Sequence, residues 1–347
     1  APEIVFDPES RILRGRITAA GDHVFTVRAR NRFGETTERL TVKVGDTIAL
    51  TPPMGWNSWN CFGREISDEK VRAAADAFVR LGLDDHGWSY LVIDDFWARR
   101  PCETNDVRLM GAERSADGTI LPNKKFPDMK ALADEMKKKG VRAGIWIRYL
   151  NDSERQTEGI LPEHRMTNDN KYLDPSHPDI LALVTKDTKR IVDWGYQLIK
   201  HDFSTYDIFA TWGSQRAQSI TDNGWHFYDR TKTSAEIVIN LYRTIREAEG
   251  DGVLILGCNV IGHLAAGLVE LNRTGDDTSG REWERTRKYG VNTLAFRMMH
   301  NDTFYAADAD CVGITGDIDW KLNREWLRAL SVSGSPLFVS CKPGVLN

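Results

Sequence analysis

The sequence of 347 residues is long enough for a barrel domain of about 250 residues with one small module beside it. Its hydrophobic fraction of 41% and its charged fraction of 28% are ordinary for a soluble globular protein. The formal net charge of -4 gives no electrostatic case for binding nucleic acid or an anionic membrane surface, and no stretch approaches the ~20 apolar residues of a membrane helix.

Residues 1–48 differ from the rest of the chain and predict a small β-sandwich-like domain. Apolar and polar residues alternate over 25–30 and again over 40–44, on either side of a turn that contains Asn31 and Gly34. Such alternation around a glycine-containing turn is typical of an antiparallel hairpin with one face in water. We expect this domain to brace its neighbour rather than to carry chemistry.

From residue 49 onward the pattern changes to strand, helix, strand and predicts a (β/α)8 barrel. Helical periodicity with terminal signals covers 67–83, 127–140, 178–195 and 234–249. Eight strands are expected at 55–57, 90–93, 143–147, 197–202, 253–257, 268–271, 304–307 and 336–339. Eight such steps fit a closed parallel barrel better than an open doubly wound sheet. Because the sequence ends soon after the eighth strand, we expect the barrel of 49–347 to be truncated near its C-terminal end.

The five cysteines are scattered and contain no Cys-x-x-Cys pair, which argues against a zinc or redox cluster. Their odd number leaves at least one thiol unpaired within the chain. Cys61 and Cys102 can form a disulfide only if their two loops meet.

Charged side chains stand at the ends of three predicted strands. The residues concerned are Asp94 and Asp95 after the second strand, Lys200 and Asp202 at the fourth, and Arg273, Asp276 and Asp277 after the sixth. A barrel gathers such positions around one pocket at its C-terminal face. Any single Asp of this kind is more often a helix cap or a loop ion pair. The set together indicates a functional site, because a carboxylate after an apolar run is costly unless it is solvated, paired or bound.

Two carboxyl groups on either side of a scissile bond are what glycoside hydrolysis requires. One attacks the anomeric carbon, and the other protonates the leaving oxygen and then activates water. A base beside the nucleophile, such as Lys200, would keep that nucleophile ionised. Some of the eleven tryptophans could line a sugar pocket, although core packing must account for most of them.

Five segments resemble the α-galactosidase clan, glycoside hydrolase families 27 and 36. They are Thr-Pro-Pro-Met-Gly-Trp-Asn-Ser-Trp-Asn at 51–60, Leu-Val-Ile-Asp-Asp-Phe-Trp at 91–97, Leu-Ile-Lys-His-Asp-Phe at 198–203, Arg-Thr-Gly-Asp-Asp at 273–277 and Ser-Gly-Ser-Pro-Leu at 333–337. The segments occur in the order of the clan and span most of the chain after residue 50. The first resembles the start of the clan's catalytic barrel, the third its Lys-x-Asp nucleophile motif, and the fourth its acid/base motif.

Carried over residue by residue, the resemblance implies that Asp202 is the nucleophile and Asp277 the acid/base. It further implies that the sugar is bound by Trp56, Asp94, Asp95, Trp146, Lys200 and Arg273. Asp276 competes for the acid/base role, because some members of the clan carry a Gly-Asp pair there. Asp277 is preferred because it keeps the four-residue step from Arg273. Trp146 stands where family 27 often places a tyrosine and family 36 a tryptophan.

The loop after the fifth strand departs from the clan. Members often show Cys-Glu-x-Pro there, which reads the 2-substituent of the sugar, whereas this chain has Cys-Asn-Val-Ile-Gly-His at 258–263. Galactose, N-acetylgalactosamine and L-arabinopyranose therefore all stay open as the preferred sugar. Strand alternation turns His201 away from the side that Lys200 and Asp202 share, which predicts a packed residue. His263 is interpreted as a solvated loop residue.

The sequence thus predicts a retaining exo-glycosidase that removes a terminal α-linked galactose or a closely related sugar from an oligosaccharide or glycoconjugate. Two rivals from other classes are a metal-dependent isomerase or hydrolase, against which the shortage of well-placed histidines argues, and a carbohydrate-binding protein without catalysis. No metal, organic cofactor, nucleic acid or membrane partner is expected. The reaction class suggests a secreted or periplasmic protein whose signal peptide has been removed.

Overall fold

The computed structural model describes residues 3–9, 12–45, 51–103, 105–155, 157–167, 169–210, 225–250 and 252–345. The chain divides into two compact units, Ala1–Thr51 and Pro52–Asn347, here called the N-terminal unit and the barrel unit. The domain boundary expected at residue 48 lies outside the described residues.

The described strands of the N-terminal unit form two antiparallel pairs. β1 (Glu3–Asp7) pairs with β2 (Ile12–Arg16), and β3 (Gly21–Asn31) pairs with β4 (Gly34–Val44). The predicted hairpin is confirmed, with Phe25 opposite Leu40 in the register. The stacking of the two pairs into a sandwich stays a prediction.

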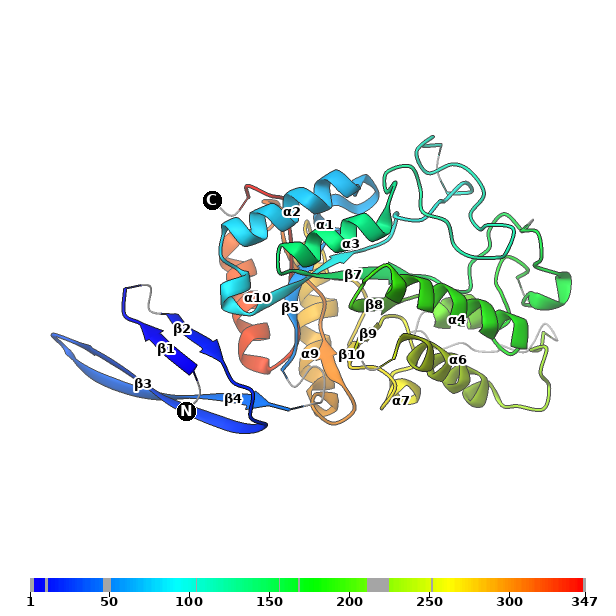
Figure 1. Cartoon of the computed structure of the whole chain (residues 1–347). Coiled ribbons are helices and arrows are strands. Elements are labelled where there is room, and N and C mark those ends of the chain that lie inside the picture. Colours follow the sequence, from blue (N-terminus) through cyan, green and yellow to red (C-terminus); the bar gives the residue numbers. More distant parts are fainter. Residues whose placement is uncertain are drawn as a thin grey trace. The chain divides into compact units, whose positions relative to one another are not determined.

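The barrel unit is built on a parallel sheet of nine strand segments (Figure 1). These are β5 (Met54–Asn57), β6 (Trp88–Ile93), β7 (Arg142–Ile147), β8 (Leu198–His201), β9 (Leu254–Gly257), β10 (Leu271–Arg273), β11 (Ala306–Asp308), β12 (Val312–Ile314) and β13 (Leu337–Cys341). The spatial order is β11-β10-β9-β8-β7-β6-β5-β13-β12. Each strand from β5 to β10 therefore lies beside the strands that precede and follow it in the barrel, as in a (β/α)8 fold.

The seventh barrel strand is interrupted, and its two halves pair with opposite edges of the sheet. β11 pairs with β10 at one edge of the sheet, and β12 pairs with β13 at the other. Only residues 309–311 separate the two segments, so they are halves of one strand that joins both edges. Asp310, with φ of 70° in the left-handed region, makes the break. The predicted (β/α)8 barrel is confirmed.

The helices of the barrel unit pack outside the strands. The longer ones are α2 (Asp68–Arg80), α3 (Met129–Lys138), α4 (Pro178–Asp193), α6 (Ser234–Glu249) and α10 (Trp320–Ser333). The shorter ones are α1 (Trp59–Phe62), α5 (Ser204–Phe209), α7 (Gly262–Ala265), α8 (Trp283–Thr286) and α9 (Asn292–Arg297), with further short helical turns at η1 (Gly63–Glu65), η2 (Asp84–His86), η3 (Pro162–His164), η4 (Arg287–Val291) and η5 (Met298–His300).

N-terminal capping residues followed by an apolar stripe explain why the predicted helices form where they do. The Ser67 side chain accepts a hydrogen bond from the N–H of Lys70 and begins α2, whose buried face includes Val71 and Phe78. In α6 the Thr233 and Glu236 side chains each accept a hydrogen bond from the other residue's backbone N–H, which is a capping box. Asp128 caps α3, so Pro127 precedes this helix, which was expected to begin at residue 127.

Two strand predictions were out of position. The sixth strand was expected at 268–271 but is β10, which begins at Leu271 and contains Arg273 as its last residue. The seventh was expected at 304–307 but begins at Ala306. Phe304 is exposed, and Tyr305 packs against His300, so these aromatic residues precede the strand. His201 is buried between Tyr149 and Tyr242, which confirms that it is a packed residue.

Candidate active site

The ends of β5, β6 and β8 meet around a buried ion pair. Lys200 donates from Nζ to Asp94 Oδ2 over 2.7 Å, and Asn57 Nδ2 donates to the same oxygen over 2.8 Å. Although burial works to lower it, the pKa of Lys200 stands well above its usual value because the Asp94 charge is so close. A buried cation therefore lies two residues before Asp202 in the chain.

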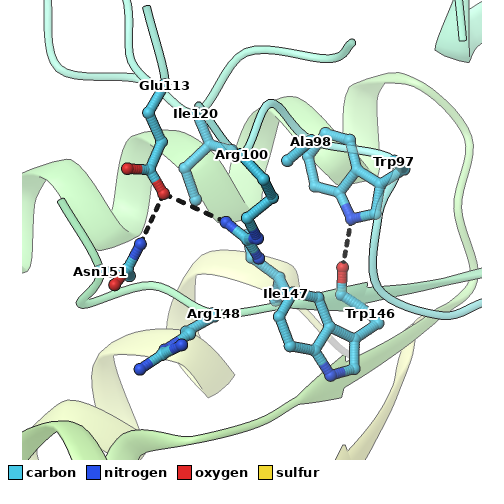
Figure 2. A pocket seen from close by; sticks show the side chains of 9 residues that line it. All are labelled: Trp97, Ala98, Arg100, Glu113, Ile120, Trp146, Ile147, Arg148 and Asn151. Carbon is cyan, nitrogen blue, oxygen red and sulfur yellow. Dashed lines mark hydrogen bonds and ion pairs between the residues drawn. The ribbon is translucent and has the colours of Figure 1, made fainter. Parts of the chain in front are cut away.

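Asp95 is held by an arginine from the long loop between β6 and α3. Arg100 donates from Nη2 to Asp95 Oδ1 over 2.9 Å and from Nη1 to Glu113 Oε1 over 3.1 Å. The Arg100 guanidinium carbon also lies 5.5 Å from the ring centroid of Trp146, a cation–π distance. Figure 2 shows Arg100 between Glu113 and this indole, in a small pocket that Ile147 and Arg148 also line. Arg100 thus connects a predicted sugar-binding carboxylate to a predicted wall of the pocket.

Asp202, directly after β8, is buried and surrounded by N–H donors. Trp146 Nε1 donates to Oδ2 over 2.8 Å, whereas Asn259 Nδ2 and the backbone N–H of Phe203 donate to Oδ1 over 2.8 Å and 2.6 Å. Burial raises the pKa of Asp202, while the Lys200 charge and the hydrogen bonds from Trp146 and Asn259 oppose the rise. All of these partners favour the ionised carboxylate that a nucleophile must be.

Asp277 has a different environment, in the loop after β10. Its Oδ1 lies 3.2 Å from Arg273 Nη2, and its side chain is 38% exposed. Burial works to raise the pKa of Asp277, but the charges of Arg273 and Lys200 outweigh it and hold that pKa below its usual value. Asp277 also raises the pKa of Asp202, so the two carboxyl groups are close enough to interact electrostatically.

Asp276 is turned to another partner. Its Oδ2 lies 3.1 Å from Arg285 Nη2, and its Oδ1 accepts the backbone N–H of Asp277. The structure therefore brings Asp277, rather than Asp276, against Arg273. Arg273 itself is buried and also donates to Asp310 Oδ2 over 3.0 Å.

Trp56 is the predicted site residue that the structure does not bring to this group. Its Nε1 donates to the carbonyl of Cys341, and its ring lines an apolar cavity with Ala74 and Phe78 of α2. The side chain thus lies on the helix side of the sheet. Because strand residues alternate between faces, it is the neighbouring Asn57 that points to Asp94.

Several residues around the site were missed by the sequence analysis. Asp308 is the last residue of β11 and Asp310 lies two residues after it, so both occupy the kind of strand-end position that marks Asp94 and Asp202. Burial raises the pKa of Asp308 to about 6. Asn259 and Arg100 come from loops, where no local signal marks which side chain reaches the pocket.

The cysteines are free in the described part of the chain. Cys61 is buried and Cys102 is exposed, so they do not form the disulfide that the sequence left open. Cys258 lies in the site, where its Sγ is 3.5 Å from Arg273 Nη1, and burial raises the pKa of its thiol well above the usual value. A neutral thiol is therefore expected there.

One group of described residues has ligand atoms close enough to hold a metal ion, namely His164, His177 and Asp179. Both imidazole Nδ1 atoms accept backbone N–H groups, from Leu161 and from Asp179. A neutral imidazole with an accepting Nδ1 carries its proton on Nε2, so His164 donates toward Asp179 rather than binding a cation.

No helix among the described residues is long and apolar enough to cross a membrane.

The fold and the site define a (β/α)8 barrel with two unlike carboxylates at the C-terminal ends of its strands. No family model matches the chain. An α-galactosidase of Cyamopsis tetragonoloba is 34% identical over 178 residues, which are 50% of this chain and 36% of that protein. A probable α-galactosidase B of Penicillium simplicissimum is 24% identical over 321 residues, 85% of this chain and 65% of that protein.

Solved structures agree on the fold. The crystal structure of a family 27 β-L-arabinopyranosidase from Geobacillus stearothermophilus matches with a TM-score of 0.65 at 20% identity, covering 84% of this chain and 72% of that one. These relatives confirm the resemblance to α-galactosidases that the sequence motifs predicted. The chain spans between about a third and two thirds of the length of the two curated relatives.

Proposed function

We propose that the chain is a retaining exo-glycosidase that hydrolyses a terminal α-linked galactose or a closely related sugar. The observation that carries this proposal is the contrast between the two carboxyl groups. Asp202 is buried and accepts three N–H donors, whereas Asp277 is partly exposed and can exchange a proton with water. A nucleophile needs the first environment, and an acid/base needs the second.

In the first step, Asp202 attacks the anomeric carbon while Asp277 donates a proton to the leaving oxygen. In the second step, Asp277 takes a proton from water, whose oxygen displaces Asp202 from the sugar. Asp94, Asp95, Lys200 and Arg273 supply the charged hydrogen-bond partners for the sugar hydroxyls. Trp146 supplies an N–H to the nucleophile.

The pKa values of Asp202 and Asp277 set the pH range of this reaction. Arg273 and Lys200 hold the pKa of Asp277 low, so Asp277 gains its catalytic proton only in acid solution. Burial holds the pKa of Asp202 high, so Asp202 loses its charge early as the pH falls. We therefore expect a narrow activity optimum on the acid side of neutrality, with two apparent pKa values that belong to the interacting pair.

The sugar is the open part of the proposal. A β-L-arabinopyranosidase among the structural neighbours favours L-arabinopyranose as a second candidate, because that sugar is galactopyranose without its C6 hydroxymethyl group. The same chemistry on an α-N-acetylgalactosaminide is a third. We place the protein outside the cytoplasm, secreted or periplasmic, with an oligosaccharide or glycoconjugate as its substrate.

Hydrolysis of a p-nitrophenyl glycoside panel tests the proposal. The panel contains the α-galactoside, α-N-acetylgalactosaminide, β-L-arabinopyranoside and α-glucoside. We expect activity on one of the first three that is lost in Asp202→Ala and Asp277→Ala. Asp276→Ala is the matched control and should keep most of it. If the folded protein binds a sugar of the panel but hydrolyses none, the carbohydrate-binding alternative replaces this proposal.

A further inference from the structure

The two oxygens of Asp202 have unequal hydrogen bonding. Oδ1 accepts from Asn259 Nδ2 and from the backbone N–H of Phe203, whereas among the described residues Oδ2 accepts from Trp146 Nε1 alone. A carboxylate oxygen has two lone-pair directions in the plane of the group. Among the described residues, Oδ1 has both directions filled, and Oδ2 keeps one for a reacting atom.

Asn259 is fixed in its place by its backbone. Its φ of 49° lies in the left-handed region, which asparagine adopts more readily than most residues. The N–H of Thr205 in α5 donates to the Asn259 carbonyl over 3.2 Å, and the N–H of Cys258 donates to the carbonyl of His201. The segment after β9 is thereby tied to the segment that carries Asp202.

We propose that Asn259 is a positioning residue that gives the two oxygens of Asp202 different tasks. Oδ2 attacks the anomeric carbon, and Oδ1 becomes the carbonyl oxygen of the glycosyl ester, held by Asn259 and the Phe203 N–H. This inference rests on the proposed function.

The bonds change as follows. A lone pair of Oδ2 forms the bond to the anomeric carbon, while the bond from that carbon to the leaving oxygen breaks and the leaving oxygen takes the proton of Asp277. In the second step, water forms the new bond to the anomeric carbon and gives its proton to Asp277. The carbon–Oδ2 bond breaks, and its electron pair returns to the Asp202 carboxylate.

The hydrogen bond from Asn259 matters most when Asp202 is charged, because a carboxylate accepts more strongly than an ester carbonyl. Losing it should slow the second step, in which the carboxylate is regenerated, more than it slows the first. It should also raise the pKa of Asp202, since the Asn259 amide is among the groups that lower it. The titratable groups that interact with Asp202 are Lys200, Asp277, Asp207 and Cys258.

Asn259→Gly is the appropriate variant, because glycine removes the amide and accepts the left-handed backbone without strain. Asp302→Gly is the matched control, since exposed Asp302 has a φ of 57° and lies outside the site. With a p-nitrophenyl glycoside, we expect kcat of Asn259→Gly to fall about 10-fold to 100-fold. Its glycosyl-enzyme should accumulate in intact-protein mass spectra. The basic limb of the kcat/KM profile, which the higher pKa of Asp202 sets, should move to higher pH.

A carbon-13 carboxyl titration provides a readout that needs no turnover, with the Asp202 signal assigned from Asp202→Asn. The pKa of Asp202 should rise in Asn259→Gly and stay unchanged in Asp302→Gly. An Asn259→Gly protein whose Asp202 titration matches that of the control overturns the inference, even if the protein hydrolyses glycosides. If the parent hydrolyses nothing, the proposed function fails, and the titration alone decides whether Asn259 controls Asp202.

Discussion

Replacing Arg100 by Met should lower the free energy of unfolding of the barrel unit by about 3–5 kcal/mol, the usual cost of removing one partner from a buried ion pair. The Arg100 side chain is 4% exposed and makes charge-assisted hydrogen bonds of 2.9 Å to Asp95 and 3.1 Å to Glu113. Met fills much of the same volume but leaves both carboxylates without their cation. The free energy of unfolding of Arg100→Lys should lie between those of the parent and of Arg100→Met, because an ammonium group cannot form both bonds in the same planar arrangement.

Urea unfolding followed by fluorescence measures this difference. Arg99→Met is the matched control, because Arg99 donates to the backbone carbonyls of Pro122 and Ala112 and not to a carboxylate. We expect that control to cost less than about 1 kcal/mol. An Arg100→Met protein as stable as the Arg99→Met control would refute the reasoning that Arg100 neutralises this part of the site.

Three further predictions concern titration. Burial lowers the pKa of His201 to about 3 from 6.5 in the unfolded chain, so its contribution to stability is full above pH 6.5 and is lost as the pH falls toward 3. In His201→Phe, the melting temperature should therefore depend less on pH between 3 and 6.5. Burial raises the pKa of Glu249 to about 9 from 4.5, so the stability of the fold decreases as the pH rises between these values. At pH 8, the free energy of unfolding measured in urea should be about 1–3 kcal/mol higher in Glu249→Gln than in the parent. Arg285 helps to lower the pKa of Asp277, so Arg285→Gln should move the acid limb of the kcat/KM profile to higher pH. An unmoved acid limb would contradict that role.

The parts of the fold that were predictable have complete local signals. The helix that Ser67 begins and the helix between Thr233 and Glu249 carry both an N-terminal cap and an apolar stripe, so the residues at which they begin follow from the sequence. The seventh strand lacks such a signal, because Asp310 interrupts it and the preceding Phe304 only looks like a strand residue. Its two short halves are stabilised by pairing with different neighbours, which a local pattern does not record.

The same distinction holds in the site. Asp94, Lys200 and Asp202 were found because each belongs to the end of an apolar strand, where the barrel itself sets their position. Asn259 and Arg100 reach the pocket from loops, so their contacts depend on the path of the chain through space. Trp56 was chosen for its motif, although alternation along β5 assigns it to the helix side of the sheet.

Azide rescue tests the assignment of the two carboxyl groups most directly. Asp202→Gly and Asp277→Gly are each incubated with azide and a p-nitrophenyl glycoside that the parent hydrolyses, and the glycosyl azide is identified by proton NMR. We expect Asp202→Gly to yield the azide of inverted anomeric configuration and Asp277→Gly to yield that of retained configuration. A rescued Asp277→Gly that gives the inverted product, or a parent enzyme that releases the inverted sugar, would contradict the account.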